Sequence, residues 1–438
     1  MNTARLHQRF LLCSGANTDT RKIKQGCMYF ALKGENFDGN LFAADALAAG
    51  ARYVVVDDKL VAESNEQYIL VKNVLESLQK LALFHRNYLG IPILAITGSN
   101  GKTTTKELIN AVLSRKFKTI ATHGNLNNHI GVPLTLLSMD QQTEFGIVEM
   151  GANHPLEIAF LCTIANPDYG YITNFGKAHL EGFGSLEGVV KAKTELYHHL
   201  QEETKLIFLN LDDEVQQKHR NYKHTFAFGE HPESEVQVKY LDGEKYAGVH
   251  YNQTDFISKL TGNYNGRNMA AALCIGLYFK VPFDEIEKAI AAYSPDNNRS
   301  EMIEAGSNTI ILDAYNANPT SMQAALQNFS SLKTDKQKIA ILGDMFELGS
   351  SAPVEHQSII TDAENGNLTE IYLLGDNFNL TETSSSFTFK FKSMEALKNH
   401  LEETNFKNCY FLIKGSRGMA LERVLENIPA KKSSSRLS

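Results

Sequence analysis

Residues 91–105 read Ile-Pro-Ile-Leu-Ala-Ile-Thr-Gly-Ser-Asn-Gly-Lys-Thr-Thr-Thr, and they decide how the surrounding chain folds. An apolar run of strand length leads into a turn of small residues. The apolar positions that follow, Leu108 with Val112 and Ile109 with Leu113, recur at helical spacing. A loop between a strand and a helix presents backbone N–H groups and a helix N-terminus to an anion. The stretch therefore predicts a loop that binds the phosphates of a nucleoside triphosphate.

This loop departs from the general phosphate-binding pattern at one position. The usual spacing places a glycine five residues before Gly101, where this chain has Ile96, and Gly98 begins the turn instead. A chance Gly-Lys-Thr in an ordinary turn is the alternative, but the flanking strand and helix favour phosphate binding. Lys102 can reach the β- and γ-phosphates, and the Thr103 hydroxyl can bind Mg²⁺. We expect ATP to contact Gly98, Ser99, Asn100, Gly101, Lys102, Thr103 and Thr104.

Length and composition describe an ordinary globular protein of more than one domain. The 438 residues are too many for a single core and suggest about three domains. Hydrophobic residues make up 43% of the chain and charged residues 21%, which is usual for soluble domains. The formal net charge of −7 argues against a general nucleic-acid binder, whose basic surface would dominate the composition. We therefore expect no nucleic-acid partner.

The cysteines and the apolar runs indicate the compartment. The five cysteines are scattered, odd in number and without a Cys-x-x-Cys pair, which fits a reducing environment. The chain shows no charged segment followed by a short apolar run at its start, and no run of about 18 apolar residues. We expect a cytoplasmic protein that is not inserted in a membrane.

Strand-like and helix-like segments alternate along the chain, which predicts an α/β protein. Residues 1–90 read as a small α/β unit, 91–304 as a doubly wound parallel sheet, and 305–438 as a second open parallel sheet. The second boundary, near residues 304–308, is inferred from the restart of the pattern. Two polar clusters in the first unit, at residues 18–21 and 33–39, read as turns, with ligand contact as the less common alternative.

Polar residues follow the strands of the predicted central sheet. Glu149 ends one strand, and His179 lies in the polar segment after another. Ligands of such sheets gather at the carboxyl ends of the strands, where a carboxylate can bind Mg²⁺ and a neutral imidazole can supply another ligand. Asn265 and Asn268 share one face of a helix start. Helix capping explains one of these two amides, and the second indicates a ligand.

Taken together, these motifs resemble the Mur ligase family, whose members form amide bonds in peptidoglycan assembly with the use of ATP. The resemblance rests on residues 97–105, Glu149-Met150-Gly151, Ala178-His179-Leu180-Glu181, the Asn265 and Asn268 pair, and Asn298-Arg299. Four further strings are similar to the members that add D-alanyl-D-alanine to UDP-N-acetylmuramoyl-tripeptide: residues 124–128, Asp313-Ala314-Tyr315-Asn316-Ala317-Asn318-Pro319, residues 342–349, and Lys414-Gly415-Ser416-Arg417-Gly418. The family uses a shorter loop, Thr-Gly-x-x-Gly-Lys-Thr, which accounts for Ile96.

The resemblance implies a layout and a set of substrates. An N-terminal domain (1–90) would bind the UDP-sugar, a central domain (91–304) would bind ATP, and a Rossmann-like C-terminal domain (305–438) would bind D-alanyl-D-alanine. The chain would act as a monomer, with Mg²⁺, in cytoplasmic peptidoglycan precursor synthesis. The ATP γ-phosphate would activate the tripeptide carboxylate as an acyl phosphate, which the dipeptide amine would attack.

The resemblance also implies residue roles. Lys102, Glu149, His179 and Lys193 would be catalytic, and Thr103, Glu149, His179 and Lys193 would bind Mg²⁺. Asn268, Arg299 and Asp313 would hold the nucleotide. Candidate substrate contacts are Asp19, Thr20, Arg21, Asp38, Asn127, Asn316, Asn318, Asp344 and Arg417.

The helix expected after Gly184-Ser185 carries two lysines, Lys191 and Lys193. On their own they read as a solvated charged face. Residues two apart point about 200° away from each other around a helix, so only one of them can face a metal. The family resemblance implies that Lys193 is this residue and that it is carbamylated, which gives it a carboxylate-like Mg²⁺ ligand.

Other functions remain open at this point. Within the same catalytic logic, the alternatives are a Mur ligase that adds the third peptide residue and a folylpolyglutamate synthase. Residues 313–319 speak against both. An alternative of another class is a regulatory ATPase module that binds ATP and ligates nothing.

Overall fold

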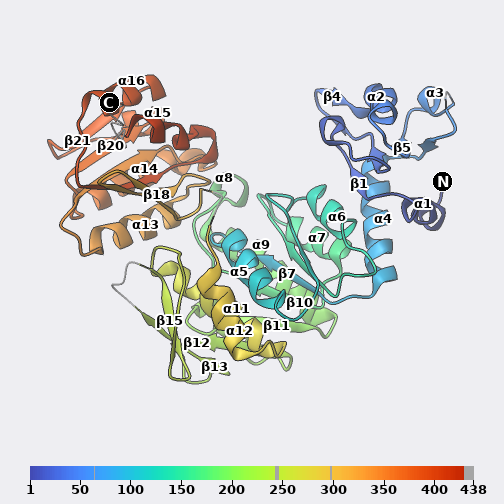
Figure 1. Ribbon diagram of the computed structural model, residues 1–438, viewed down its shortest axis with the longest axis horizontal. Coiled ribbons are helices and arrows are strands. Elements are labelled where there is room, and N and C mark those ends of the chain that lie inside the picture. Colours follow the sequence, from blue (N-terminus) through green and yellow to red (C-terminus); the bar gives the residue numbers. More distant parts are fainter. Residues whose placement is uncertain (64, 242–245, 296–297, 429–438) are drawn as a thin grey trace, which may run out of the picture.

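The computed structural model describes residues 1–63, 65–241, 246–295 and 298–428. The last ten residues of the predicted C-terminal domain therefore lie outside the described part. The chain builds an N-terminal, a central and a C-terminal sheet, each with its own helices, so the α/β prediction is confirmed. In Figure 1 the N-terminal part (blue) and the C-terminal part (red) lie apart from each other, above the central part.

The N-terminal part is a four-stranded parallel sheet with short helices. Its elements are α1 (Thr3–Phe10), β1 (Ala16–Asn17), β2 (Met28–Phe30), β3 (Lys33–Gly34), β4 (Phe37–Asp38), α2 (Ala43–Ala48), β5 (Tyr53–Val56), α3 (Lys59–Ala62), β6 (Tyr68–Leu70) and α4 (Val74–Leu89). The sheet order is β1-β2-β5-β6, and β3 pairs with β4 as a separate hairpin. The two polar clusters are local turns: Asp19 and Asp38 each cap a short 3₁₀ helix.

Helix α4 joins the N-terminal and central parts (Figure 1). Its apolar face packs against α1 and against central helices, because Leu78, Leu81 and Ala82 are fully buried in a cluster shared by both parts. Gly90 ends the helix with a φ of 65°. Arg86 forms an ion pair of 2.6 Å with Asp168, which fastens α4 to the central part. The boundary predicted at residue 90 thus coincides with the end of this helix.

The central part is a seven-stranded, fully parallel sheet with a small antiparallel sheet beside it. Its strands are β7 (Ile93–Thr97), β8 (Thr119–Ala121), β9 (Phe145–Glu149), β10 (Tyr169–Ile172), β11 (Leu206–Asn210), β12 (Thr225–Gly229), β13 (Val236–Gln237), β14 (Lys239–Leu241), β15 (Gly248–Tyr251) and β16 (Thr254–Ile257). The large sheet has the order β13-β12-β11-β10-β7-β9-β8. The antiparallel sheet β14-β15-β16 was not predicted.

Helices cover both faces of the large sheet, as expected for a doubly wound fold. The central helices are α5 (Lys102–Leu113), α6 (Gly131–Leu136), α7 (Glu157–Ala165), α8 (Leu180–Phe183), α9 (Leu186–Glu202), α10 (Glu214–Gln217), α11 (Tyr264–Tyr278) and α12 (Phe283–Ala292). Helices α6, α7 and α9 pack on one face, and α5, α11 and α12 on the other. Strand β7 lies between β10 and β9, so the loop after it opens at the middle of the sheet edge.

The C-terminal part is a six-stranded sheet in the order β17-β18-β22-β19-β20-β21. Its elements are β17 (Glu301–Ala305), β18 (Asn308–Asp313), α13 (Pro319–Ser331), β19 (Gln337–Gly343), α14 (Ala352–Glu364), β20 (Glu370–Leu374), α15 (Asp376–Asn379), β21 (Thr388–Phe391), α16 (Met394–Glu403) and β22 (Cys409–Lys414). All neighbours are parallel except β17, which forms an antiparallel hairpin with β18.

This hairpin moves the second domain boundary. The sheet begins at Glu301, before the expected boundary at 304–305, and residues 306–307 form the turn of the hairpin. A single strand that folds back on the next one gives no helix to mark the restart, so the sequence pattern gave no sign of β17. Within the described residues, no helix has the length and apolar character needed to cross a membrane.

Candidate active site

A cavity of about 1150 Å³ lies between the central and C-terminal parts. The central sheet contributes the loop after β7, the end of β9, the segment after β10 and the start of α11. The C-terminal sheet contributes the segment after β18 and the end of β22. Of the predicted site residues, the cavity is lined by Ser99, Asn100, Gly101, Lys102, Thr103, Thr104, Asn127, Glu149, His179, Asn268, Arg299, Asp313 and Asn316.

The phosphate-binding loop is residues 98–101, between β7 and α5. Gly98 and Gly101 have φ values of 140° and 75°, so both need the left-handed region that glycine tolerates. A side chain at Gly98 would also collide with Thr173. Ile96 is fully buried inside β7. The position at which the general pattern has a glycine therefore belongs to the strand in this chain, and the loop begins after it. Lys102 Nζ donates to the carbonyl oxygens of Gly98 and Ser99 at 2.8 and 3.2 Å.

Glu149 lies beside this loop because β9 pairs with β7. The Thr103 hydroxyl donates to Glu149 Oε2 at 2.9 Å, and Asn127 Nδ2 donates to Oε1 at 2.9 Å. The carboxylate is 1% exposed, so these partners fix its orientation. Asn127 was predicted as a substrate contact, and in the structure its amide nitrogen donates to Glu149. The buried Lys106 Nζ lies 4.0 Å from the same carboxylate.

Lys193 points inward from α9, whereas Lys191 is exposed, so the prediction that the two lysines face opposite ways is confirmed. The Lys193 amine is 1% exposed, donates to Ala152 O at 3.2 Å and lies 5.2 Å from the centre of the Phe183 ring. Burial, assisted by the charge of Lys102, holds the pKa of Lys193 well below its ordinary value. No carboxylate of the described residues forms an ion pair with it.

His179 is the start of α8 and has a φ of 51°. Its Nδ1 lies 2.5 Å from Glu347 Oε2 in the C-terminal part, and this hydrogen bond lowers the pKa of Glu347. Because the Glu347 carboxylate contacts Nδ1, Nε2 is the nitrogen that can accept a hydrogen bond or bind a metal.

The two asparagines at the start of α11 are buried under the loop. Asn268 Nδ2 donates to Asn265 Oδ1 at 2.8 Å, and Asn268 Oδ1 accepts from the Thr105 hydroxyl at 3.0 Å. A Cβ at Gly101 would lie 2.8 Å from Asn268. The pair thus supports the loop from below while Asn268 also lines the cavity.

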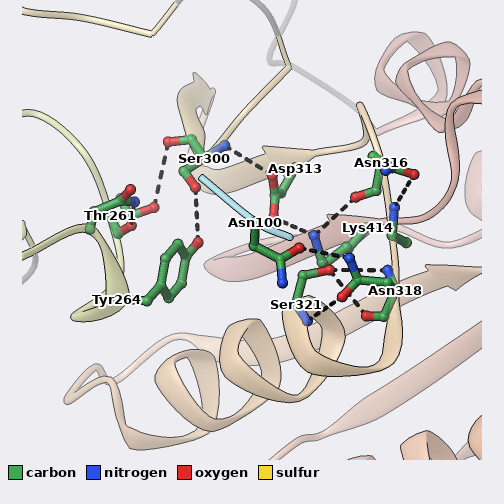
Figure 2. A network of polar contacts seen from close by, with 11 residues as sticks. Asn100, Thr261, Tyr264, Ser300, Asp313, Asn316, Asn318, Ser321 and Lys414 are labelled. Carbon is green, nitrogen blue, oxygen red and sulfur yellow. Dashed lines mark hydrogen bonds and ion pairs between the residues drawn. The ribbon is translucent and has the colours of Figure 1, made fainter. Parts of the chain in front are cut away.

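The C-terminal wall of the cavity is a polar network, shown in Figure 2. Lys414 Nζ forms an ion pair of 2.6 Å with Asp313 and donates to Asn316 O at 3.3 Å. Asp313 also accepts from Ser300 N at 3.3 Å, and the Ser300 hydroxyl lies 2.9 Å from the hydroxyl of Tyr264 on α11. The network therefore joins the central and C-terminal parts.

A second connection runs through Asn318, which caps α13. Its Oδ1 accepts from Ser321 N at 2.9 Å, and its Nδ2 donates to Asn100 Oδ1 at 2.7 Å (Figure 2). Both ends of the Asn318 amide therefore have protein partners. Asn318 does not line the cavity but contacts the phosphate-binding loop, and its predicted contact with the substrate stays a prediction.

The other predicted substrate residues lie away from the cavity. Asp19, Thr20, Arg21 and Asp38 belong to the N-terminal part, where Arg21 donates to Asp19 and holds the pKa of that carboxyl at about 2. Arg417 pairs with Glu422 at 2.8 Å and is mostly exposed.

The carboxylate of Asp344 is buried and has protein partners. It is 2% exposed, and it accepts from the backbone N–H groups of Asn377 and Phe378 at 2.9 and 3.0 Å, which caps α15. A Cβ at Gly375 would collide with its carboxylate. The contact between Asp344 and the incoming dipeptide stays a prediction, while in the structure this strand-end carboxylate caps the next helix of its own sheet.

We expect Asp344→Ala to lower the free energy of unfolding of the C-terminal part by about 2–4 kcal/mol, because it leaves two buried N–H groups unpaired. Urea unfolding followed by a C-terminal fluorescent label measures the loss. Asp376→Ala is the matched control, because it removes an exposed carboxylate from the first residue of α15. A reduced affinity for dipeptide at unchanged stability would contradict the structural role.

Three residues of the site were not singled out from the sequence. Lys414 was quoted only as the first residue of a string similar to the dipeptide-adding members, yet it holds Asp313. Tyr315 lies under Arg299, whose guanidinium carbon is 3.6 Å from the ring centre. Glu347 pairs with His179 from another domain. Charge at a strand end was a usable signal for Lys414, whereas nothing local marked the other two.

The chain is similar to known proteins over nearly its whole length. Residues 13–86, 96–276 and 298–417 match the models described as Mur ligase family, catalytic domain; Mur ligase middle domain; and Mur ligase, glutamate ligase domain. A UDP-N-acetylmuramoyl-tripeptide--D-alanyl-D-alanine ligase of Bacillus subtilis (strain 168) is 35% identical over 431 residues, which cover 94% of this chain and 93% of that protein. The chain belongs to the Mur ligase family. The resemblance read from the sequence is thereby confirmed.

Other Mur ligases agree in length and fold. The protein of the same name from Escherichia coli (strain K12) is 32% identical and covers 93% of this chain and 92% of its own. The crystal structure of MurF ligase from Thermotoga maritima in complex with ADP has a TM-score of 0.82 at 28% identity, covering 95% of this chain and 97% of that one. MurF from Acinetobacter baumannii has a TM-score of 0.81 at 29% identity, with 94% and 92% covered.

Proposed function

We propose that this chain is an ATP-dependent ligase that joins D-alanyl-D-alanine to the terminal carboxylate of UDP-N-acetylmuramoyl-tripeptide. One observation carries the proposal: one cavity brings the phosphate-binding loop together with Asp313, Tyr315 and Asn316, which belong to the string 313–319 that resembles the dipeptide-adding members. Full-length relatives that carry the name of this activity support it. As the family resemblance implies, the proposed enzyme acts as a monomer in the cytoplasm.

The chemistry needs positioning and charge neutralisation more than a covalent protein intermediate. A carboxylate oxygen of the tripeptide attacks the γ-phosphorus of ATP, and ADP leaves. The dipeptide amine then attacks the carbonyl carbon, the C–O bond to phosphate breaks, and the amine loses a proton. Lys102 and the N-terminus of α5 hold the phosphates. Asn268, Arg299 and Asp313 hold the nucleoside.

The residues fit a bound Mg²⁺, which is a hard cation that prefers oxygen ligands. The Thr103 hydroxyl and the Glu149 carboxylate lie together next to Lys102. His179 Nε2 and a carbamylated Lys193 are suited to a second ion. Among the described residues no three His, Cys, Asp or Glu side chains form a metal cluster, so phosphate oxygens would complete the coordination. The ion, when bound, neutralises charge on the transferred phosphoryl group.

The N-terminal part binds the UDP-sugar, with Asp19, Thr20, Arg21 and Asp38 as candidate contacts, and Arg417 lies toward the incoming dipeptide. These assignments rest on the family resemblance. Domain closure would be needed to bring such distant residues to the cavity.

Phosphate release tests the function. We expect release to require both UDP-N-acetylmuramoyl-tripeptide and D-alanyl-D-alanine, and mass spectrometry to find the pentapeptide product. Tripeptides that end in L-lysine and in meso-diaminopimelate should be assayed side by side. Phosphate release that ignores both substrates would instead indicate a regulatory ATPase.

A further inference from the structure

The amide of Asn318 has a fixed orientation. At the start of α13, its Oδ1 accepts from Ser321 N, while its own N–H donates to the Ser321 hydroxyl at 3.1 Å, which forms a capping box. A backbone N–H can only donate, so the oxygen end of the amide must face the helix. The nitrogen end is consequently directed out of the C-terminal part.

That nitrogen fixes a second amide, on the phosphate-binding loop. Asn318 Nδ2 donates to Asn100 Oδ1 at 2.7 Å, and Figure 2 shows the nitrogen of Asn100 turned away from Asn318. The backbone of Asn100 is held independently, because Thr173 and Asn174 donate to its carbonyl oxygen at 2.6 and 2.9 Å. Only the side chain of Asn100 therefore responds to Asn318.

Asn100 lines the cavity together with Lys102, and its oxygen is occupied by Asn318. Within the described residues, that hydrogen bond is the one the Asn100 side chain makes. What it presents to the cavity is then an NH₂ group, which donates to an anion. The opposite orientation would present a carbonyl oxygen, which repels phosphate oxygens.

We propose that Asn318 is a positioning residue that sets the amide orientation of Asn100, so that docking of the C-terminal part turns an N–H donor toward the phosphates of ATP. The inference rests on the proposed function for the presence of ATP in the cavity. The phosphate site is then complete only after the C-terminal part has docked on the central part. Lys414 supports the arrangement, because it holds Asp313 and Asn316 at the base of the segment that carries Asn318.

Asn318→Asp tests this with little change in shape. Aspartate keeps an oxygen for Ser321 N, so α13 remains capped and the melting temperature should stay close to wild type. It offers no donor, so the Asn100 amide should reverse and present its oxygen to the phosphates. We expect kcat for ligation to fall about 10- to 100-fold, the range for a hydrogen bond to a charged group. KM for ATP should change little, because the contact forms after docking.

Three further variants separate the explanations. Asn318→Ser also caps a helix but is uncharged and too short to reach Asn100, so a similar fall in kcat excludes a simple charge effect. Ser393→Asp places the same charged cap at the start of α16, away from the cavity, and should have wild-type kinetics. In an Asn100→Ala background, Asn318→Asp should add little, because the two residues act as one unit.

A wild-type kcat in Asn318→Asp would overturn the inference. So would a double variant in which the effects of Asn100→Ala and Asn318→Asp on kcat multiply. A parallel loss of melting temperature and activity in both Asn318 variants would also overturn it, since Asn318 would then be structural. The proposed function fails separately: if the wild type releases phosphate without forming product, the same four variants can still be compared by their rates of phosphate release.

Discussion

Lys102→Ala should reduce the rate of amide formation by on the order of a hundredfold or more, the largest loss expected from a single substitution in the loop. The amine donates to two loop carbonyls and lies where the phosphates of ATP would be held. Burial lowers the pKa of Lys102, and the negative charge of Glu149 opposes this shift. Product formation under saturating ATP and both substrates measures the effect.

The stability of this variant should change little, because a phosphate ligand on a loop contributes little to a core. Lys118→Ala, an exposed lysine beyond the end of α5, serves as the control and should keep wild-type activity. Turnover retained in Lys102→Ala, with an unchanged melting curve, would refute the assignment of the loop.

The loop itself could be predicted because its determinants are local. A strand, glycines at the turn and a helix with apolar residues at helical spacing occur within about 25 residues, and each part supports the others. Glu149 was also predictable, since strand-end polar residues of a parallel sheet meet at one edge. Helix geometry predicted that Lys191 and Lys193 face opposite ways, and the family resemblance implied that Lys193 is the inward one.

Contacts between distant segments could not be read in the same way. Asp313 and Lys414 are opposite each other only because β18 and β22 are neighbours in the sheet, although about a hundred residues separate them. Asn318 was predicted only as a substrate contact, and its partner Asn100 lies on another domain. The sequence also did not indicate that Asp344 caps α15, because a strand-end carboxylate serves a ligand and a helix cap equally well. Pairing order and domain docking decide these cases, and neither has a local pattern.

Lys193→Ala is expected to lose most activity, while Lys191→Ala stays close to wild type. The reason is that a buried amine with no carboxylate partner among the described residues is costly as a cation, and a neutral amine is the form that reacts with CO₂ to give a carbamate. A carbamate would supply a negatively charged oxygen ligand beside Ala152, at the wall of the cavity. Activity assays with Mg²⁺ and both substrates compare the two variants.

Rescue by a small carboxylate distinguishes a carbamate from a plain structural lysine. Lys193→Ala leaves room for acetate, which can replace the missing carboxylate, so part of the activity should return in its presence and the Mg²⁺ concentration for half-maximal rate should fall. Chloride at the same ionic strength is the control, because it cannot bridge as a carboxylate does. Lys193→Met fills the same volume without a ligand and should respond weakly to acetate. A packing role would predict the reverse order, with Lys193→Met active and Lys193→Ala insensitive to acetate, because filling the space would then matter and the charge would not.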